Sequence, residues 1–345
     1  MSKKSRGGTA VEWQATGLQV IRSAYQNGVR IGVSEDQVQK VEKYLESEWG
    51  IIFPIDDSLD NMKLTSLISR SVWENFINVY NKRLKLIQSN LKVPDNLELE
   101  FYELIGDESL IGVVHSLKRS VILDQICASY SIAKLLPNGS TILEVGSHAA
   151  YLGIYLASNT ECSITSEDFS TRAIDLANLK GAPLARFRAR ERNYCTWNGA
   201  GENFDLVIAC CAGDRNSTPR LIDYCVRQVS RGGLLFFVGD DSLTDRGRLQ
   251  ITQSLVSAGF SLIEADAVGG LDSSGPGGDF SPRMLLVFRQ DGGGIIPKTF
   301  SEIAGRHWRG FSEYANDPST PASRKTQAWY NAVGCKDERL RSAGS

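Results

Sequence analysis

The chain has 345 residues, 42% of them hydrophobic, which suits one large domain or two smaller ones with a substantial core. Its formal net charge of −2 argues against a dedicated nucleic-acid-binding protein, which usually carries a clear excess of basic residues. No run approaches the roughly 18 apolar residues that span a bilayer, and no apolar stretch of signal-peptide length follows the basic start. We therefore expect a cytoplasmic protein.

Before the first strand-like run, apolar residues recur at the spacing of amphipathic helices. Helices are predicted over residues 10–28, 34–50, 64–91 and 120–136. A less regular piece, residues 93–119, separates the last two. The sequence "PNGS" at 137–140 then predicts a turn, after which the character of the chain changes.

From residue 141 onward, apolar runs of strand length alternate with helical segments. Strands are predicted over residues 141–145, 162–166, 185–189, 204–211, 234–239, 261–268 and 283–289. Helices are predicted over residues 151–159, 170–181, 218–233 and 243–260, the third one closed by Gly232 and Gly233. This alternation predicts an α/β fold with a doubly wound, mainly parallel seven-stranded sheet behind an N-terminal helical cap. The last two strands lack a helix between them, which favours antiparallel pairing at the sheet edge.

The cysteines are the next source of information, because their spacing distinguishes disulfides, metal sites and buried thiols. They lie at positions 127, 162, 195, 210, 211, 225 and 335, with no CxxC pair among them. Most lie within hydrophobic runs, a pattern typical of buried thiols in a reducing compartment rather than of disulfides or zinc ligands. We expect no metal site.

Four local signatures occur in a consistent order through this alternating region. The stretch "ILEVGSHAAYLG" (142–153) places Glu144 two residues before Gly146, and "ITSEDFS" ends a strand with Glu167 and Asp168. The strand "FDLVIACC" and the glycine turn of "VSRGGLLFFVG" follow. In this order they resemble a class I S-adenosylmethionine-dependent methyltransferase over roughly residues 120–290. The front segment also loosely resembles bacterial sugar O-methyltransferases.

The resemblance implies S-adenosylmethionine as cofactor and a set of residues that bind it. In an open parallel sheet, ligands bind beyond the carboxyl ends of the strands where the strand order reverses. Gly146 would allow close approach of the cofactor to the backbone, and Asp168, with Glu167 as its rival, would accept hydrogen bonds from the ribose. Glu144 would lie near the amino group. The full set is Glu144, Gly146, Ser147, His148, Glu167, Asp168 and Phe169.

The loop departs from the family pattern, since His148 and Ala150 stand where further glycines would be expected. Many enzymes of the family tolerate a polar residue at the first of these positions, and Ala150 adds only a methyl group. We expect the loop to retain its cofactor, the alternative being a degenerate loop on a fold kept for other purposes.

Catalytic residues are harder to choose, because much of the rate of an in-line methyl transfer comes from positioning. A hydroxyl or amine acceptor gains further from a general base. Asp214, after the fourth strand, and His115, in the irregular piece before the domain, are our candidates; Asp240 after the fifth strand is a rival. Each has a structural alternative, as a helix N-cap or turn residue for the aspartates and as a half-buried side chain for His115.

Two further motifs lie near the predicted third strand. The arginines of "RFRARER" (186–192) alternate, which favours one solvated face over a phosphate or nucleic-acid site. Tyr194 and Trp197 follow at the place where the adenine ring packs in the family that the chain resembles.

Together these features predict an enzyme that methylates a small hydroxylated acceptor, such as a sugar or another natural product, with O-methylation favoured. We divide the chain into a helical cap at 1–118, a cofactor-binding domain at 119–291 and a tail or lid at 292–345, and expect a homodimer through the cap. The alternatives are cyclisation or elimination on the same fold, a non-catalytic protein that binds a cofactor or partner, and an RNA methyltransferase. The last would need a contiguous basic face.

Overall fold

The computed structural model describes residues 35–51, 69–89, 91–116, 119–134, 136–210, 212, 217–238, 245–268 and 283–292. Five helices in these ranges precede the first strand: α2 (Glu35–Trp49), α4 (Arg70–Gln88), α5 (Asp95–Ile105), α6 (Glu108–Ser116) and α7 (Arg119–Ala133). They confirm the predicted helices at 34–50 and 120–136 and most of the one at 64–91. The helix predicted over residues 10–28 and the tail after residue 292 lie outside the described residues.

The segment at 93–119 is more regular than its sequence suggested, because it forms the two short helices α5 and α6. They are separated by Gly106, and a second glycine, Gly112, lies inside α6. A Cβ atom on Gly112 would lie 2.8 Å from the carbonyl oxygen of Trp49 at the end of α2. The glycine that weakens the helical signal therefore allows two helices to pack closely.

The strands and helices of the sheet region follow the predicted alternation. They are β1 (Thr141–Val145), α8 (Tyr151–Asn159), β2 (Ser163–Asp168), α9 (Thr171–Gly181), β3 (Phe187–Glu191), β4 (Phe204–Cys210), α10 (Thr218–Gln228), β5 (Val229–Val238), α11 (Asp245–Ser257), β6 (Phe260–Val268) and β7 (Arg283–Gln290). The strand order is β3-β2-β1-β4-β5-β7-β6, in which β7 runs antiparallel to both of its neighbours. The expected α/β architecture with a mainly parallel sheet is confirmed.

One predicted boundary is wrong. Gly232 and Gly233 do not close a helix: α10 ends at Gln228, and both glycines lie inside β5. Gly232 has a φ angle of +79°, and the pairing of β5 with β4 shifts register nearby, between Phe204 and Leu206. The glycines therefore form an irregularity at the start of a strand, where residues without side chains are also favoured.

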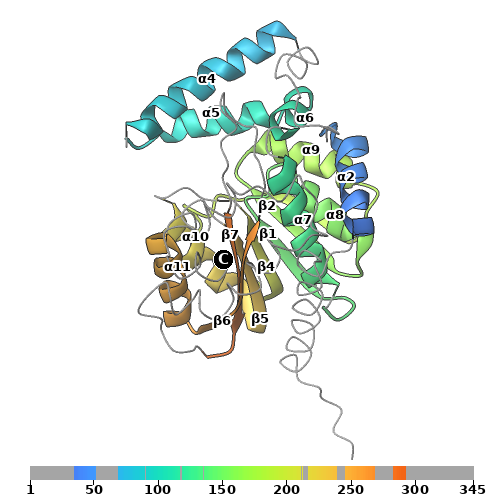
Figure 1. The fold of residues 1–345 in the computed structure, drawn as a ribbon, viewed down its shortest axis with the longest axis vertical. Coiled ribbons are helices and arrows are strands. Elements are labelled where there is room, and N and C mark those ends of the chain that lie inside the picture. The colour runs from blue at the N-terminus through green and yellow to red at the C-terminus, as the bar shows by residue number, and fades with distance from the viewer. Residues whose placement is uncertain are drawn as a thin grey trace, which may run out of the picture.

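Helices cover both faces of the sheet, as Figure 1 shows. Ile142 of β1 packs in one core with residues of α2, α7 and α8, whereas Leu143 packs in another with residues of α10 and α11. Because neighbouring residues of a strand point to opposite faces, a strand buried between two helical layers is apolar at nearly every position. This explains the continuous apolar runs in the sequence.

The helices α4, α5 and α6 lie beyond the edge of this three-layered body and enclose a smaller apolar cluster of their own (Figure 1). Its buried members are Phe76, Val79, Phe101, Ile105, Leu110 and Val114. Among the described helices, none is long and apolar enough to cross a membrane.

The start of α9 is the place where α5 and the sheet region meet. The carboxylate of Glu103 accepts a hydrogen bond from the backbone N–H of Arg172 at 3.3 Å, and Asp107 pairs with the Arg172 guanidinium at 3.3 Å. A Cβ atom on Gly106 would come within 3.0 Å of the Ala173 nitrogen. These contacts hold α5 against the start of α9. Asp168, the last residue of β2, and Phe169, the first residue of the turn, lie just before it.

Candidate functional site

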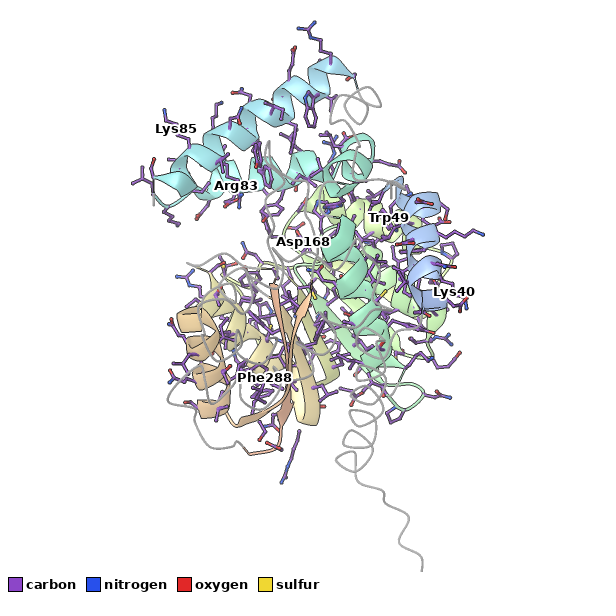
Figure 2. All side chains as sticks on the ribbon, viewed as in Figure 1. Lys40, Trp49, Arg83, Lys85, Asp168 and Phe288 are labelled. Atoms are coloured by element: carbon purple, nitrogen blue, oxygen red, sulfur yellow. The ribbon has the colours of Figure 1, made fainter. Side chains whose placement is uncertain are left out.

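The order of strands locates the candidate site. The sheet runs outward in both directions from β1 and β4, so the strand order reverses between them, and the carboxyl ends of these strands are the expected place for a ligand. The loop from Val145 to Tyr151 leaves β1 there, and β2 ends beside it at Asp168. Figure 2 shows Asp168 at this end of the sheet, on the side of α5 and α6.

The loop after β1 has an unusual backbone. Gly146, His148 and Ala150 have φ angles of 66°, 51° and 57°, so every second residue is left-handed. Glycine adopts this conformation readily, whereas residues with a Cβ atom do so at a cost of roughly 1–2 kcal/mol each. The loop thus keeps the conformation of an alternating glycine loop even though two of its three left-handed positions are not glycine.

The packing around Gly146 gives a second reason for a glycine at this position. A Cβ atom at this position would lie 2.4 Å from the Cβ atom of Ala212, directly after β4. Contact between the loops after β1 and β4 therefore already requires a glycine here, whether or not a ligand approaches. Ser147 is buried as well, and its backbone N–H donates to the carbonyl of Glu167 at 2.9 Å, which joins the loop to β2.

Glu144 lies beneath the loop and is almost completely buried. Its Oε2 accepts hydrogen bonds from the backbone N–H of Gly153 at 3.0 Å and from the Ser166 hydroxyl at 2.7 Å. Burial raises its pKa to about 8, although both hydrogen bonds oppose the shift. The side chain is thus protonated at neutral pH, and its contacts connect β1 to β2 and α8.

Asp168 closes β2 with a carboxylate that backbone groups hold in place. Its Oδ2 accepts from the N–H of His148 at 2.8 Å, and its Oδ1 accepts from the N–H of Ser170 at 2.9 Å. Burial raises its pKa to about 6, with these hydrogen bonds acting in the opposite direction. Each carboxylate oxygen offers about two acceptor positions, so the side chain retains capacity for further donors.

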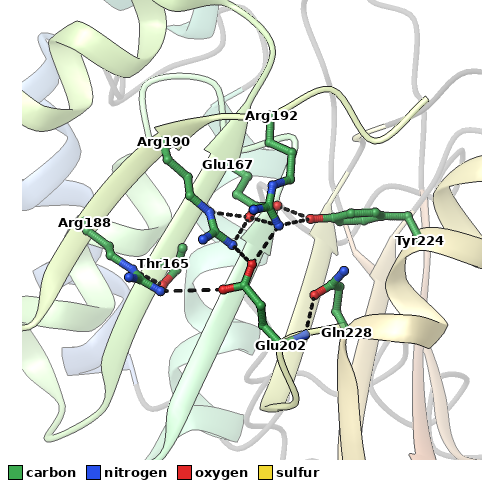
Figure 3. Close-up of polar contacts among 8 residues, drawn as sticks. All are labelled: Thr165, Glu167, Arg188, Arg190, Arg192, Glu202, Tyr224 and Gln228. Carbon is green, nitrogen blue, oxygen red and sulfur yellow. Dashed lines mark hydrogen bonds and ion pairs between the residues drawn. The ribbon is translucent and has the colours of Figure 1, made fainter. Parts of the chain in front are cut away.

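Glu167, the neighbour of Asp168, points to the opposite face of the sheet and joins the arginine network drawn in Figure 3. Its Oε1 accepts from Arg190 Nε at 2.7 Å and lies 3.2 Å from Arg192 Nη1, and its Oε2 accepts from the Tyr224 hydroxyl. Glu202 completes the network, with its Oε1 accepting from Arg190 at 2.6 Å and from Arg192 at 2.9 Å.

These pairings refine the expectation for the alternating arginines of β3. Arg188, Arg190 and Arg192 do share one face, but only Arg188 is largely exposed; the side chains of the other two are 27% and 17% exposed. Their charges are neutralised by Glu167 and Glu202.

Trp197 and Tyr194 also take definite places. Arg192 stacks over the Trp197 ring at 5.0 Å and Arg227 at 5.6 Å. Trp197 therefore belongs to the arginine network. Tyr194 instead donates from its hydroxyl to the carbonyl of Ala212 at 2.7 Å, at the carboxyl end of β4. Of the two aromatic residues, Tyr194 lies at the end of the sheet where the strand order reverses.

His148 is buried between the loop and the helices α5 and α6. Its ring centroid lies 5.2 Å from that of His115, and only the Tyr102 backbone offers it a partner among the described residues, so at least one ring nitrogen lacks a hydrogen bond there. Burial lowers its pKa to about 4, while the nearby backbone of Tyr102 acts in the opposite direction. The imidazole is therefore neutral at physiological pH.

Further aromatic residues continue from this pair. His115 contacts Tyr151 at the start of α8, with centroids 5.3 Å apart, and Tyr102 of α5 packs edge-to-face on Phe169 at 5.2 Å. Sequence reasoning missed Tyr102, because it lies in the segment taken as irregular. Of the predicted catalytic candidates, only His115 is described; Asp214 and Asp240 lie outside the described residues.

No family model matches the sequence, and no curated protein matches it. Solved structures to which the chain is similar include a [4+2]-cyclase, SpnF, at 16% identity, 50% coverage of this chain and 82% of that one, and a TM-score of 0.40. Another is a TehB-like SAM-dependent methyltransferase from Corynebacterium glutamicum (16% identity, 46% and 83% coverage, TM-score 0.35). A third is the N-methyltransferase NodS from Bradyrhizobium japonicum in complex with S-adenosyl-L-homocysteine (21%, 44% and 78%, 0.34).

Proposed function

We propose that the chain is an S-adenosylmethionine-dependent methyltransferase that acts on a small hydroxylated acceptor. The observation that carries the proposal is the loop after β1, with its three left-handed residues at the point where the strand order reverses. Two of these, His148 and Ala150, hold a costly conformation. Such strain persists in proteins mainly at functional sites, and it supports a loop shaped for a ligand.

The residues beside the loop fit a cationic nucleoside. Asp168 has acceptor capacity beyond its backbone hydrogen bonds from His148, Phe169 and Ser170, which suits the hydroxyls of a ribose. Burial raises the pKa of both Asp168 and Glu144, and a positive charge nearby would offset that burial cost. We assign cofactor contacts to Gly146, Ser147, the backbone of His148, Asp168 and Phe169, with Glu144 supporting the loop from below.

When bound, the cofactor supplies a methyl group on a positively charged sulfur, which an acceptor oxygen can attack in line. The role of this chain is then to orient both partners and to exclude water, which accounts for a large part of the rate in reactions of this type. His115 and Asp214 remain our candidates for accepting the acceptor's proton. O-methylation is favoured, since an imidazole or a carboxylate is a suitable general base for a hydroxyl.

We further propose that α4, α5 and α6 form a cap on the acceptor side and mediate a homodimer. The contacts of Glu103 and Asp107 with Arg172 support the cap, because they hold the end of α5 against the start of α9, where Arg172 lies four residues after Asp168. The domain limits of 1–118, 119–291 and 292–345 and a cytoplasmic location are part of the same proposal.

Calorimetric titration with S-adenosylhomocysteine, the demethylated product of the cofactor, tests the proposed function. We expect saturable binding in the micromolar range. Failure to bind at millimolar ligand would contradict it. If the ligand binds, mass analysis of acceptor products with and without S-adenosylmethionine distinguishes methyl transfer from cyclisation or elimination, because only a transferred methyl group adds to the product mass.

A further inference from the structure

We propose that the imidazole of His148 anchors the hydroxyl group of an aromatic acceptor, which packs among half-buried aromatic side chains of α5, α6 and the sheet region. This inference rests on the proposed function and deepens it, since it narrows the acceptor from hydroxylated molecules in general to phenol-like ones. Three independent features of the described residues lead to it.

The first feature is the unsatisfied polar side chain. His148 is 8% exposed, and at least one of its ring nitrogens has no hydrogen bond to a described residue, since only the Tyr102 backbone offers a partner to the ring. Buried polar groups in native proteins are nearly always satisfied, so an exception at a candidate site requires an explanation. A ligand that supplies the missing partner is one, and a hydroxyl group can both donate to and accept from a neutral imidazole.

The second feature is the backbone conformation at the same residue. His148 has a φ angle of 51°, where glycine would be free of strain. The chain therefore keeps a strained residue with an unsatisfied side chain at a position that glycine would fill at lower cost. That combination is expected where the side chain contributes to function.

The third feature is the aromatic character of the surroundings. His115 contacts both His148 and Tyr151, and Tyr102 lies beside His148 through its backbone and beside Phe169 through its ring. All four of these neighbours are half-buried. Their edge-to-face contacts, with centroids 5.2–5.3 Å apart, are the arrangement that a further planar ring can extend.

The polar groups nearby favour a phenol over a sugar. A sugar presents many hydroxyls, each of which needs a partner when buried. The carboxylate of Asp168 is assigned to the cofactor ribose, and that of Glu103 accepts from the backbone N–H of Arg172 at 3.3 Å, so neither is set aside for the hydroxyls of a sugar. A single hydroxyl on an apolar ring needs only the one anchor that His148 provides.

In the reaction, the oxygen–methyl bond forms as the carbon–sulfur bond breaks, and the electron pair of that bond stays on sulfur. The hydroxyl proton leaves oxygen and ends on water, while the imidazole of His148, whose pKa burial lowers to about 4, orients the oxygen through a hydrogen bond. No oxidant, reductant or metal is needed. His148 thus touches and orients the acceptor in this proposal, and the candidate base His115 packs against its ring.

The test uses probes that differ by one group: 4-hydroxybenzamide, benzamide, which lacks the hydroxyl, and methyl glucoside, which has hydroxyls without an aromatic ring. Each is titrated into the full chain with and without saturating S-adenosylhomocysteine. We expect 4-hydroxybenzamide to bind at least about tenfold more tightly than benzamide, and methyl glucoside to bind more weakly than either.

Two substitutions at the same position provide the matched comparison. His148→Gly relieves the backbone strain and removes the imidazole, so at saturating S-adenosylhomocysteine it should abolish the preference for the hydroxyl. His148→Asn tolerates a left-handed backbone and keeps a polar side chain, so it should retain part of the preference. The NMR signals of the His148 ring should shift with 4-hydroxybenzamide and not with benzamide.

Each other outcome overturns the inference. Equal binding of the first two probes, no binding of 4-hydroxybenzamide at millimolar concentration, or tighter binding of methyl glucoside would exclude a phenol-like acceptor. A preference that survives His148→Gly would exclude the imidazole as its anchor. A large gain in S-adenosylhomocysteine affinity in His148→Gly would mean that the side chain occupies the cofactor's place. Failure of the original chain to bind S-adenosylhomocysteine would instead contradict the proposed function. That titration contains no acceptor probe, so the two failures are distinguishable.

Discussion

Glu167 and Asp168 are adjacent carboxylates at the end of β2, yet they belong to two regions with opposite electrostatics. Glu167 faces α10 and lies within reach of the guanidinium groups of Arg190 and Arg192. Asp168 faces the loop after β1 and is held by backbone N–H groups, with its pKa raised to about 6 by burial. Removing a buried carboxylate that has cations beside it leaves those cations without their partner, whereas removing one held by backbone N–H groups does not.

The largest expected effect comes from removing the negative charge of Glu167 from the arginine network. Glu167→Gln should lower the free energy of unfolding by about 2–4 kcal/mol, somewhat below the range for a fully buried pair because both arginines are partly exposed. Asp168→Asn should cost less, about 1–2 kcal/mol, since no cation loses its partner and only one of the two backbone N–H groups loses its oxygen acceptor. Urea unfolding of both variants measures the difference. Equal losses would mean that the two regions are not distinct.

The second prediction concerns pH and the loop region. Because burial raises the pKa of Glu144 to about 8, the folded state holds a proton that the unfolded state releases near its normal pKa of 4.5. Between these two pKa values the folded state binds more protons than the unfolded state, so the free energy of unfolding falls as pH rises. From Glu144 alone, the fall between pH 6 and pH 8 is about 2 kcal/mol. Glu144→Gln keeps an oxygen acceptor for Gly153 and Ser166 and should flatten this dependence. A dependence unchanged in the variant would contradict the assignment.

The third prediction sharpens the role of Asp168 through its pKa of about 6. The ionised carboxylate is the better acceptor for ribose hydroxyls, so the affinity for S-adenosylhomocysteine should rise about tenfold from pH 5 to pH 7.5. Asp168→Asn should remove the dependence, and Glu167→Gln, where it folds, should retain it. Calorimetry at the two pH values is sufficient. A dependence that persists in Asp168→Asn would assign the titration to another group.

The smallest expected effect is at Ala150, which is left-handed at a φ angle of 57°. Ala150→Gly relieves a cost of roughly 1–2 kcal/mol, offset by the extra freedom of the unfolded chain and by the loss of a buried methyl group. We expect stability to rise by no more than about 1 kcal/mol, measured by thermal or urea unfolding. A clear decrease would show that packing of the methyl group outweighs the strain.

The sequence predicted the parts of this structure that depend on local pattern. The strand "TILEV" and the helix "YLGIYLASN" have the predicted bounds, since their apolar runs are bounded by turns. It missed α5 and α6 because Gly106 and Gly112 interrupt a short helical pattern, and it misread Gly232 and Gly233 because a glycine pair can end a helix or distort a strand.

At the candidate site, the sequence identified the carboxylates but not how they differ. Whether Glu167 meets arginines depends on the register between β2 and β3, which pairs Glu167 with Arg190. The contact between His115 and His148 likewise depends on the packing of α6 over the loop after β1. Neither relation is encoded in a local spacing, so both required the structure.

The most direct test of the central claim is the dissociation constant of S-adenosylhomocysteine for Asp168→Ala, measured beside the original chain at neutral pH. Loss of a charged acceptor should weaken binding by about 1.5–3 kcal/mol, which corresponds to roughly 10–150-fold. An unchanged dissociation constant would show that Asp168 does not face the cofactor, and it would contradict the site described above.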